Sequence, residues 1–172
     1  MDGFKMRHLA LVVALSTSMG AAFAATSNDF VDKAAAGGIA EIETSRLALE
    51  KSQSADVKAF ANMMITDHGK ANDELAAIAK KNDIEVPDET TLVKQAKEKI
   101  LDMRDESFDA AYANNQVKAH EETIELFKKE ANTVTDDKTK GAVELKGFAQ
   151  KMLPGLQKHL DMAKKLQAAH AK

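Results

Sequence analysis

The segment VKAFANMMITDHGKANDEL (residues 57–75) carries the clearest helical pattern in the chain. Its apolar residues recur at steps of three and four, the spacing that gathers side chains on one face of an α-helix. They are Val57, Phe60, Ala61, Met64, Ala71 and Leu75, with Ile78 just beyond. His68 stands inside this stripe, between Met64 and Ala71. A side chain that can titrate and bind metal is therefore predicted on the buried face of a helix.

Three further long segments show the same periodicity, so we predict an all-α chain. A first helix, capped by one of residues 27–29 and ending near Lys51, has an inward stripe of Phe30, Ala34, Gly37, Glu41, Ser45 and Ala48. A helix from about residue 107 to 131 has a stripe of Phe108, Tyr112, Gln116, His120, Ile124, Phe127 and Ala131. The last helix carries Leu145, Phe148, Ala149, Met152, Leu156, His159, Ala163 and Leu166, and Pro154 predicts a kink within it.

The connection between the second and third long helices predicts the topology. The second helix is expected over residues 54–81, and residues 82–106 contain a shorter amphipathic helix at about 91–103. Such a helix covers roughly 20 Å at 1.5 Å per residue, enough to return the chain along a bundle. This favours a ferritin-like four-helix bundle with a helix-containing crossover, in which the second and third long helices are parallel. A simple up-down-up-down bundle would not need the crossover.

The first 24 residues have the three parts of a secretory signal. Lys5 and Arg7 form a positive start, residues 9–19 are apolar, and Ala22-Phe23-Ala24 is a small-x-small cleavage site. The alternative is a membrane anchor, but spanning a bilayer takes roughly 20 apolar residues. Starting at Met6 would leave the signal intact. We therefore expect cleavage after Ala24 and a periplasmic or secreted domain of residues 25–172.

The composition of the mature chain excludes several classes of function. The whole chain has 24 Lys and Arg and 27 Asp and Glu; without Asp2, Lys5 and Arg7 the mature part keeps 22 basic and 26 acidic residues, a net charge of −4. No basic block occurs, so nucleic acid is not expected as a partner. The absence of cysteine excludes disulfides, thiol nucleophiles and thiolate metal sites. No transmembrane segment is expected in the mature chain, and a homo-oligomer or an envelope protein partner stays open.

Four inward side chains are candidate metal ligands: Glu41, His68, His120 and His159. Counted along antiparallel helices, Glu41 and His68 differ by roughly 5 Å in level, and the crossover would bring His68 level with His120. His159 is about 10 Å off the level of His120 if the chain turns near residue 136. Imidazole with one carboxylate suits Zn²⁺, Cu²⁺ or Ni²⁺.

Other placements compete with this ligand set. His159 could instead join Asp109 and Tyr112 in a hydrogen-bonding cluster near the bundle end. Asp67 points away from His68 on the helix, so we expect it in solvent rather than orienting a histidine. The frayed terminus gives His170 no predicted role. Buried histidines can also serve only to fix helix register, without any metal.

Enzyme motifs are missing. Di-iron bundles use Glu-x-x-His on two helices, and here Ile65, Val117 and Leu156 stand three residues before the histidines. A di-iron ferroxidase is therefore not expected. The chain also lacks a nucleophile elbow and a glycine-rich phosphate loop.

Four segments, in this order after the signal, resemble a known family: FVDKAAAGGIAEIETSRLAL, VKAFANMMITDH, FDAAYANNQVKAHEETIELF and FAQKMLPGLQKHL. They are similar to a bacterial ferritin-like family catalogued as domain of unknown function 4142, often labelled an outer membrane protein. The resemblance implies an exported ferritin-like bundle and no established activity. Two hypotheses follow. One is an exported protein that binds a divalent transition metal and serves in envelope or metal stress; the other is a non-enzymatic helical module for interaction or self-association, without metal.

Overall fold

The computed structural model describes residues 28–100, 108–135 and 139–171, and the five elements of this part of the chain are all α-helices. They are α1 (Asp29–Lys51), α2 (Ala55–Lys81), α3 (Glu89–Ile100), α4 (Phe108–Ala131) and α5 (Ala142–His170). The predicted all-α class is thus confirmed. The predicted signal, residues 1–24, lies outside the described residues, as do the predicted cap of α4 and the predicted end of the short helix at Met103.

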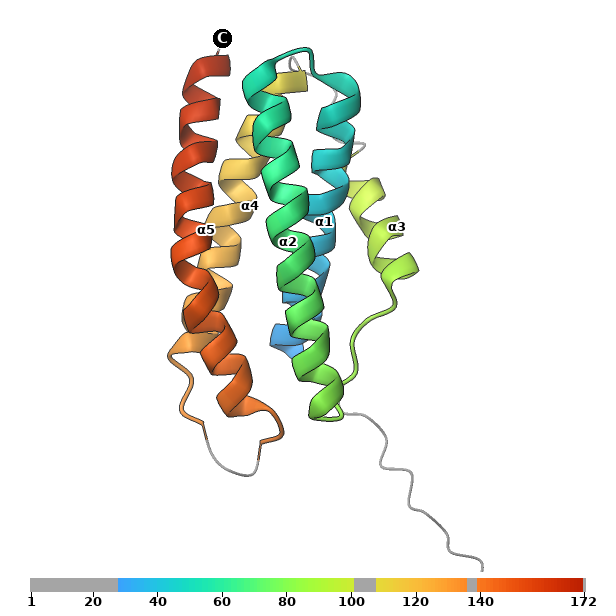
Figure 1. The fold of residues 1–172 in the computed structure, drawn as a ribbon, viewed down its shortest axis with the longest axis vertical. Helices are drawn as coiled ribbons and strands as arrows, with labels where there is room; N and C mark the ends of the chain where they lie inside the picture. The colour runs from blue at the N-terminus through green and yellow to red at the C-terminus, as the bar shows by residue number, and fades with distance from the viewer. Residues whose placement is uncertain (1–27, 101–107, 136–138, 172) are drawn as a thin grey trace, which may run out of the picture.

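Four long helices lie side by side, and α3 lies along the outside of α1 (Figure 1). The Ser54 hydroxyl donates to Asp109 Oδ2 at 2.6 Å, which ties the start of α2 to the start of α4. At the other end, an ion pair of 2.7 Å joins Lys81 at the end of α2 to Glu144 at the start of α5. Hence α2 and α4 run in the same direction, and α5 runs against both.

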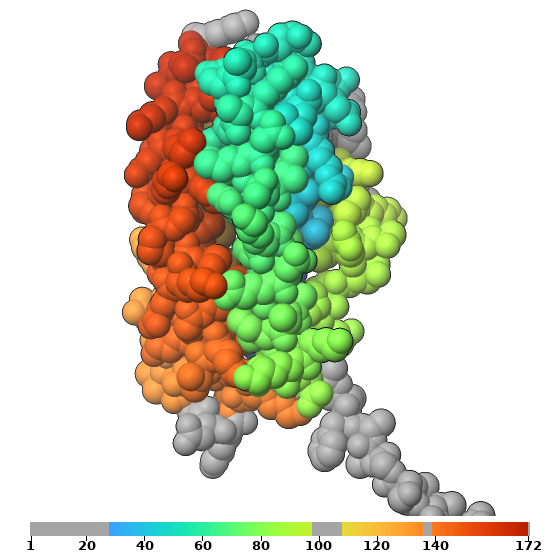
Figure 2. Space-filling view, viewed as in Figure 1, coloured from blue at the N-terminus to red at the C-terminus, as the bar shows by residue number. Residues whose placement is uncertain are grey.

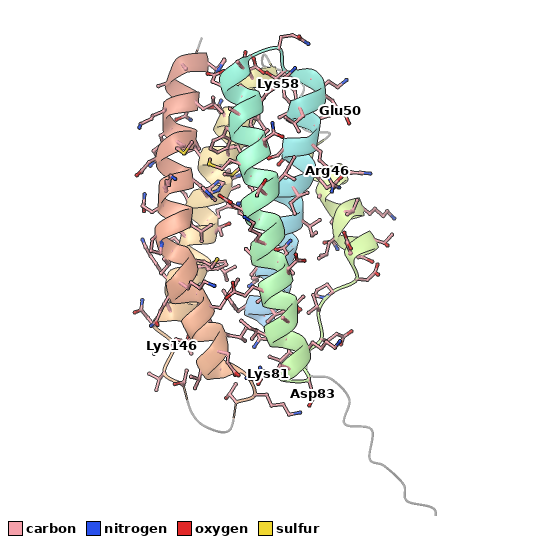
Figure 3. All side chains as sticks on the ribbon, viewed as in Figure 1. Arg46, Glu50, Lys58, Lys81, Asp83 and Lys146 are labelled. Carbon is pink, nitrogen blue, oxygen red and sulfur yellow. The ribbon has the colours of Figure 1, made fainter. Side chains whose placement is uncertain are left out.

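The two ends of the molecule can be followed in Figure 3. Glu50 and Lys58 flank the short turn between α1 and α2, whereas Lys81 and Asp83 lie at the opposite end, where the chain leaves α2 for α3. The segment that contains α3 therefore brings the chain back along α1, so that α4 can start beside the start of α2.

Local sequence chemistry accounts for the helix starts. Asn28 is the N-cap of α1, and its side-chain oxygen accepts from the backbone N–H groups of Phe30 and Val31 at 3.0 and 3.1 Å. Gly141 precedes α5 with a φ of 71°, a backbone conformation that favours glycine. The helix α5 continues through Pro154. Figure 1 shows its first part tilted against the rest, as expected for proline within a helix.

The apolar stripes predicted from the sequence meet in one core. Near the start of α1 and the end of α4 the core contains an aromatic group, in which the ring centroid of Phe127 lies 5.1 Å from that of Phe30 and 5.9 Å from that of Phe148. Close helix contact is provided by Gly38, because a Cβ there would stand 2.8 Å from Asn72 Cγ. The described part of the chain contains no helix whose length and apolar character would suit it to cross a membrane.

Candidate metal site

Three histidines from three different helices meet in the interior: His68 of α2, His120 of α4 and His159 of α5. We call them the histidine cluster. Their ring centroids are 5.5 to 5.6 Å apart in every pair, and one ring nitrogen from each lies within 4.8 Å of the others. The residues are only 7%, 1% and 6% exposed, respectively.

The helical periodicity explains how each ring reaches this place. His68 follows Met64 by four residues and His120 follows Gln116 by four, so each lies one turn further along a buried stripe. On α5, His159 follows Leu156 by three residues in the same way. Each histidine occupies a position that an apolar side chain would otherwise fill.

Hydrogen bonds fix which ring nitrogens carry protons. His120 Nδ1 lies 2.8 Å from the Gln116 carbonyl, which can only accept, so Nδ1 carries the proton. His159 Nε2 lies 3.1 Å from Asp67 Oδ2 and donates to that carboxylate. Within the described residues, His120 Nε2, His159 Nδ1 and His68 Nε2 are buried without a hydrogen-bond partner. The unprotonated nitrogens of His120 (Nε2) and His159 (Nδ1) therefore each have a lone pair for a metal. His68 Nε2 can supply a third.

The environment keeps the cluster neutral. Burial, together with the neighbouring His120 and His159, lowers the pKa of His68 to about 3. Burial likewise lowers the pKa of His120 to about 4, against the opposing effect of the Gln116 carbonyl. The pKa of His159 is lowered by burial, although Asp67 opposes the change. Neutral imidazole is the form that binds metal, so the ligands are ready at neutral pH.

The expected mismatch in level between His159 and His120 is wrong. It assumed that the chain turns near residue 136, whereas Gln150 Nε2 donates to the carbonyl of Ala131 at 3.2 Å. Gln150, eight residues into α5, is therefore beside the end of α4. His120 precedes Ala131 by eleven residues and His159 follows Gln150 by nine, which leaves a difference of about 3 Å. The first residues of α5 extend beyond the end of α4, which accounts for the remainder of the expected 10 Å mismatch.

The alternative placement of His159 beside Asp109 and Tyr112 is wrong for the same reason. Asp109 accepts a hydrogen bond from Ser54, and the Tyr112 hydroxyl lies 2.9 Å from Ser45 Oγ. The histidine near Asp109 is His170, whose Nε2 lies 3.1 Å from Asp56 Oδ2 and whose Nδ1 lies 3.9 Å from Asp109 Oδ2. The C-terminal turn of α5 is thus attached to the start of α2, which the sequence did not predict.

The expectation for Asp67 is right about solvent, since 45% of its side chain is exposed, but wrong in denying it a histidine partner. Asp67 does point away from His68, but this direction leads to α5, where its carboxylate holds His159. Consecutive residues of α2 therefore serve different rings of the cluster. The sequence signal was the pair Asp67-His68, and it could be interpreted only once α5 was placed beside α2.

Glu41 is buried on α1, with 5% of the residue exposed. It does not belong to the group of three whose ligand atoms lie within 4.8 Å of one another. Burial raises its pKa to about 7, and the Gln116 side chain opposes this. The backbone carbonyl of the same Gln116 accepts from His120. Glu41 and the histidine cluster therefore share a neighbour on α4.

An all-helical protein with three neutral, buried imidazoles from three helices offers a nitrogen site for a transition metal. The chain belongs to the DUF4142 family, a domain of unknown function, whose model matches residues 13–166. Comparison with curated proteins and with solved structures returned no match.

Proposed function

We propose that the histidine cluster binds one divalent transition ion, Zn²⁺, Cu²⁺ or Ni²⁺, and that this is the function of the domain. The observation that carries the proposal is the set of three buried ring nitrogens without hydrogen-bond partners among the described residues. A buried polar atom without a partner costs roughly 1–3 kcal/mol. Three of them in one place are costly in a purely structural cluster, whereas a metal ion satisfies all three.

The hydrogen bonds around the cluster support a metal rather than a register role. Ligand histidines usually donate their second ring nitrogen to a carboxylate or a carbonyl. His159 has such a bond to Asp67 and His120 has one to Gln116. Removal of an orienting partner of this kind typically lowers metal affinity 10- to 100-fold, so Asp67→Asn should weaken binding without removing a ligand.

The proposal extends to fold type and location. The parallel α2 and α4 and the returning segment with α3 support a ferritin-like four-helix bundle with a helix-containing crossover. The start of the sequence supports export with cleavage after Ala24. Export and metal binding together support a role in envelope or metal stress. Mass spectrometry of protein from the extracytoplasmic fraction tests export: Ala25 should be the first residue, and a full-length chain kept in the cytoplasm would refute it.

Calorimetric titration of metal-free protein with Zn²⁺, Cu²⁺ and Ni²⁺ tests metal binding. Wild type should take up about one equivalent, and its Tm should rise with metal concentration because the ion binds the folded state. His68→Ala, His120→Ala and His159→Ala should each lose this uptake. His170→Ala is the matched control, since His170 is on α5 but contacts Asp56 instead of the cluster.

Two results would contradict the proposal. One is the absence of saturable uptake by wild type for all three ions. The other is uptake that survives in all three cluster variants. In either case the helical interaction or self-association module would remain as the function of the domain.

A further inference from the structure

A cavity of about 350 Å³ lies directly beside the histidine cluster. Its polar lining includes His68, His159 and Asp67 at the cluster, together with Asn72 and Thr123. From the cluster it extends toward the ends of α2 and α4, between walls that are mainly apolar: Ala71, Leu75, Phe127, Phe148, Met152 and Leu156. This volume falls within the range of small-molecule pockets, about 300–1,000 Å³.

The cavity reaches the surface between α2 and α5. Its exposed lining residues, Asp67, Lys70, Lys151 and Gly155, come from these two helices, and Figure 2 shows α2 and α5 adjacent on this face. Lys151 is paired at 2.7 Å with Glu74 of α2, and both residues line the cavity. The cavity lining therefore has two acidic side chains, and both are paired: Glu74 with Lys151 and Asp67 with His159. Lys70 is a further cation.

The charge of a loaded site favours an anion. Three neutral imidazoles bring no charge to a divalent ion, and Asp67, held through His159, compensates one of its two charges. An isolated charge in the interior is costly unless it is paired. Three protein ligands also leave a tetrahedral ion at least one position for an outside donor.

We infer that the metal-loaded cluster binds a small monocarboxylate with an apolar tail, the carboxylate at the metal and the tail in the cavity. This inference rests on the proposed metal site and names the ligand class of that site. The polar end beside His68 and His159 accounts for the anionic group. The apolar walls beyond it account for the tail, because each buried methylene contributes to affinity.

Spectroscopy of the Co²⁺-loaded protein tests the inference, because the visible bands of Co²⁺ report both ligand number and exchange. Acetate, butanoate and hexanoate are titrated, with 1-hexanol and hexylammonium as neutral and cationic counterparts. Each carboxylate should shift the bands, and affinity should rise about fourfold for every methylene that the cavity buries. Metal-free protein should show no such series by calorimetry, and 1-hexanol and hexylammonium should leave the spectrum unchanged.

Cavity-filling variants test whether the apolar tail of the carboxylate lies in the cavity. Ala71→Phe and Met152→Trp obstruct the cavity from α2 and from α5, and should abolish the advantage of hexanoate over acetate while the Co²⁺ bands persist. Ala76→Phe is the matched control, since Ala76 is exposed on α2 and outside the cavity lining; it should bind hexanoate as wild type does.

The outcomes separate this inference from the proposed function. Absence of uptake for Zn²⁺, Cu²⁺, Ni²⁺ and Co²⁺ alike overturns the metal site and the inference with it. Normal Co²⁺ binding by wild type with no carboxylate response overturns the inference alone. Equal affinity for acetate and hexanoate, an equal response to 1-hexanol, or an unchanged hexanoate series in both filled variants does the same.

Discussion

Glu41→Gln should stabilise the protein at alkaline pH and change little at acid pH. Burial raises the pKa of Glu41 from the usual 4.5 to about 7. Between these values the unfolded chain releases the proton while the folded protein retains it, so stability is full below pH 4.5 and is lost as pH rises through 7. A difference of about 2.5 pKa units corresponds to about 3 kcal/mol at pH 8. Glutamine has nearly the same shape and carries no charge.

Urea unfolding followed by circular dichroism measures this effect. Wild type and variant are compared at pH 4.5 and pH 8 in the presence of a chelator, so that bound metal does not contribute. The variant should gain about 3 kcal/mol over wild type between the two pH values. Glu43→Gln is the control, because Glu43 lies on the same helix in an ion pair with Arg46. A Glu41→Gln advantage that is absent at pH 8, or the same at both pH values, would refute the reasoning.

Two further predictions concern packing and acid stability. Gly38→Ala should be less stable than the matched Gly37→Ala by about 1 kcal/mol, because Cβ at position 38 would displace the terminal amide of the Asn72 side chain, whereas at position 37 it would meet only Thr123 Oγ1 at 4.0 Å; thermal unfolding measures the difference, and equal stabilities would contradict it. In metal-free Glu41→Gln, which lacks the titration of Glu41, the free energy of unfolding should fall between pH 7 and pH 5. The expected loss is about 2 kcal/mol for each of His68 and His120. Their folded pKa values, about 3 and about 4, lie below the usual 6.5, so the unfolded chain takes up protons first; a flat urea midpoint over this range would exclude the effect.

The fold class followed from periodicity because the buried stripes are nearly continuous. His68 and His120 were placed at one level from the sequence, since both lie at similar depth in helices that start side by side. The same counting failed for His159. It depends on where α5 begins relative to the end of α4, and the connecting segment sets this offset without any periodic signal. The contact between Gln150 and Ala131 shows how far α5 extends.

Hydrogen-bond partners were harder to predict than levels. Asp67 lies off the buried stripe of its own helix, and only the position of α5 makes it a partner of His159. For Glu41 the helical periodicity predicted the right helix face and burial, but not whether the carboxylate joins the histidines. A shift of one helical turn, about 5 Å, decides whether a side chain can reach the histidine cluster. Counting residues around a loop has an error of the same size.

X-ray absorption spectroscopy of the Zn²⁺-loaded protein tests the metal site most directly. The structure predicts three imidazole nitrogens at about 2.0–2.1 Å from the metal, with outer-shell scattering from three rings and one further light donor. His159→Ala should remove one ring from this signal, whereas His170→Ala should leave it unchanged. A first shell of oxygen donors without imidazole scattering, or a signal that none of the three cluster variants alters, would contradict the assignment.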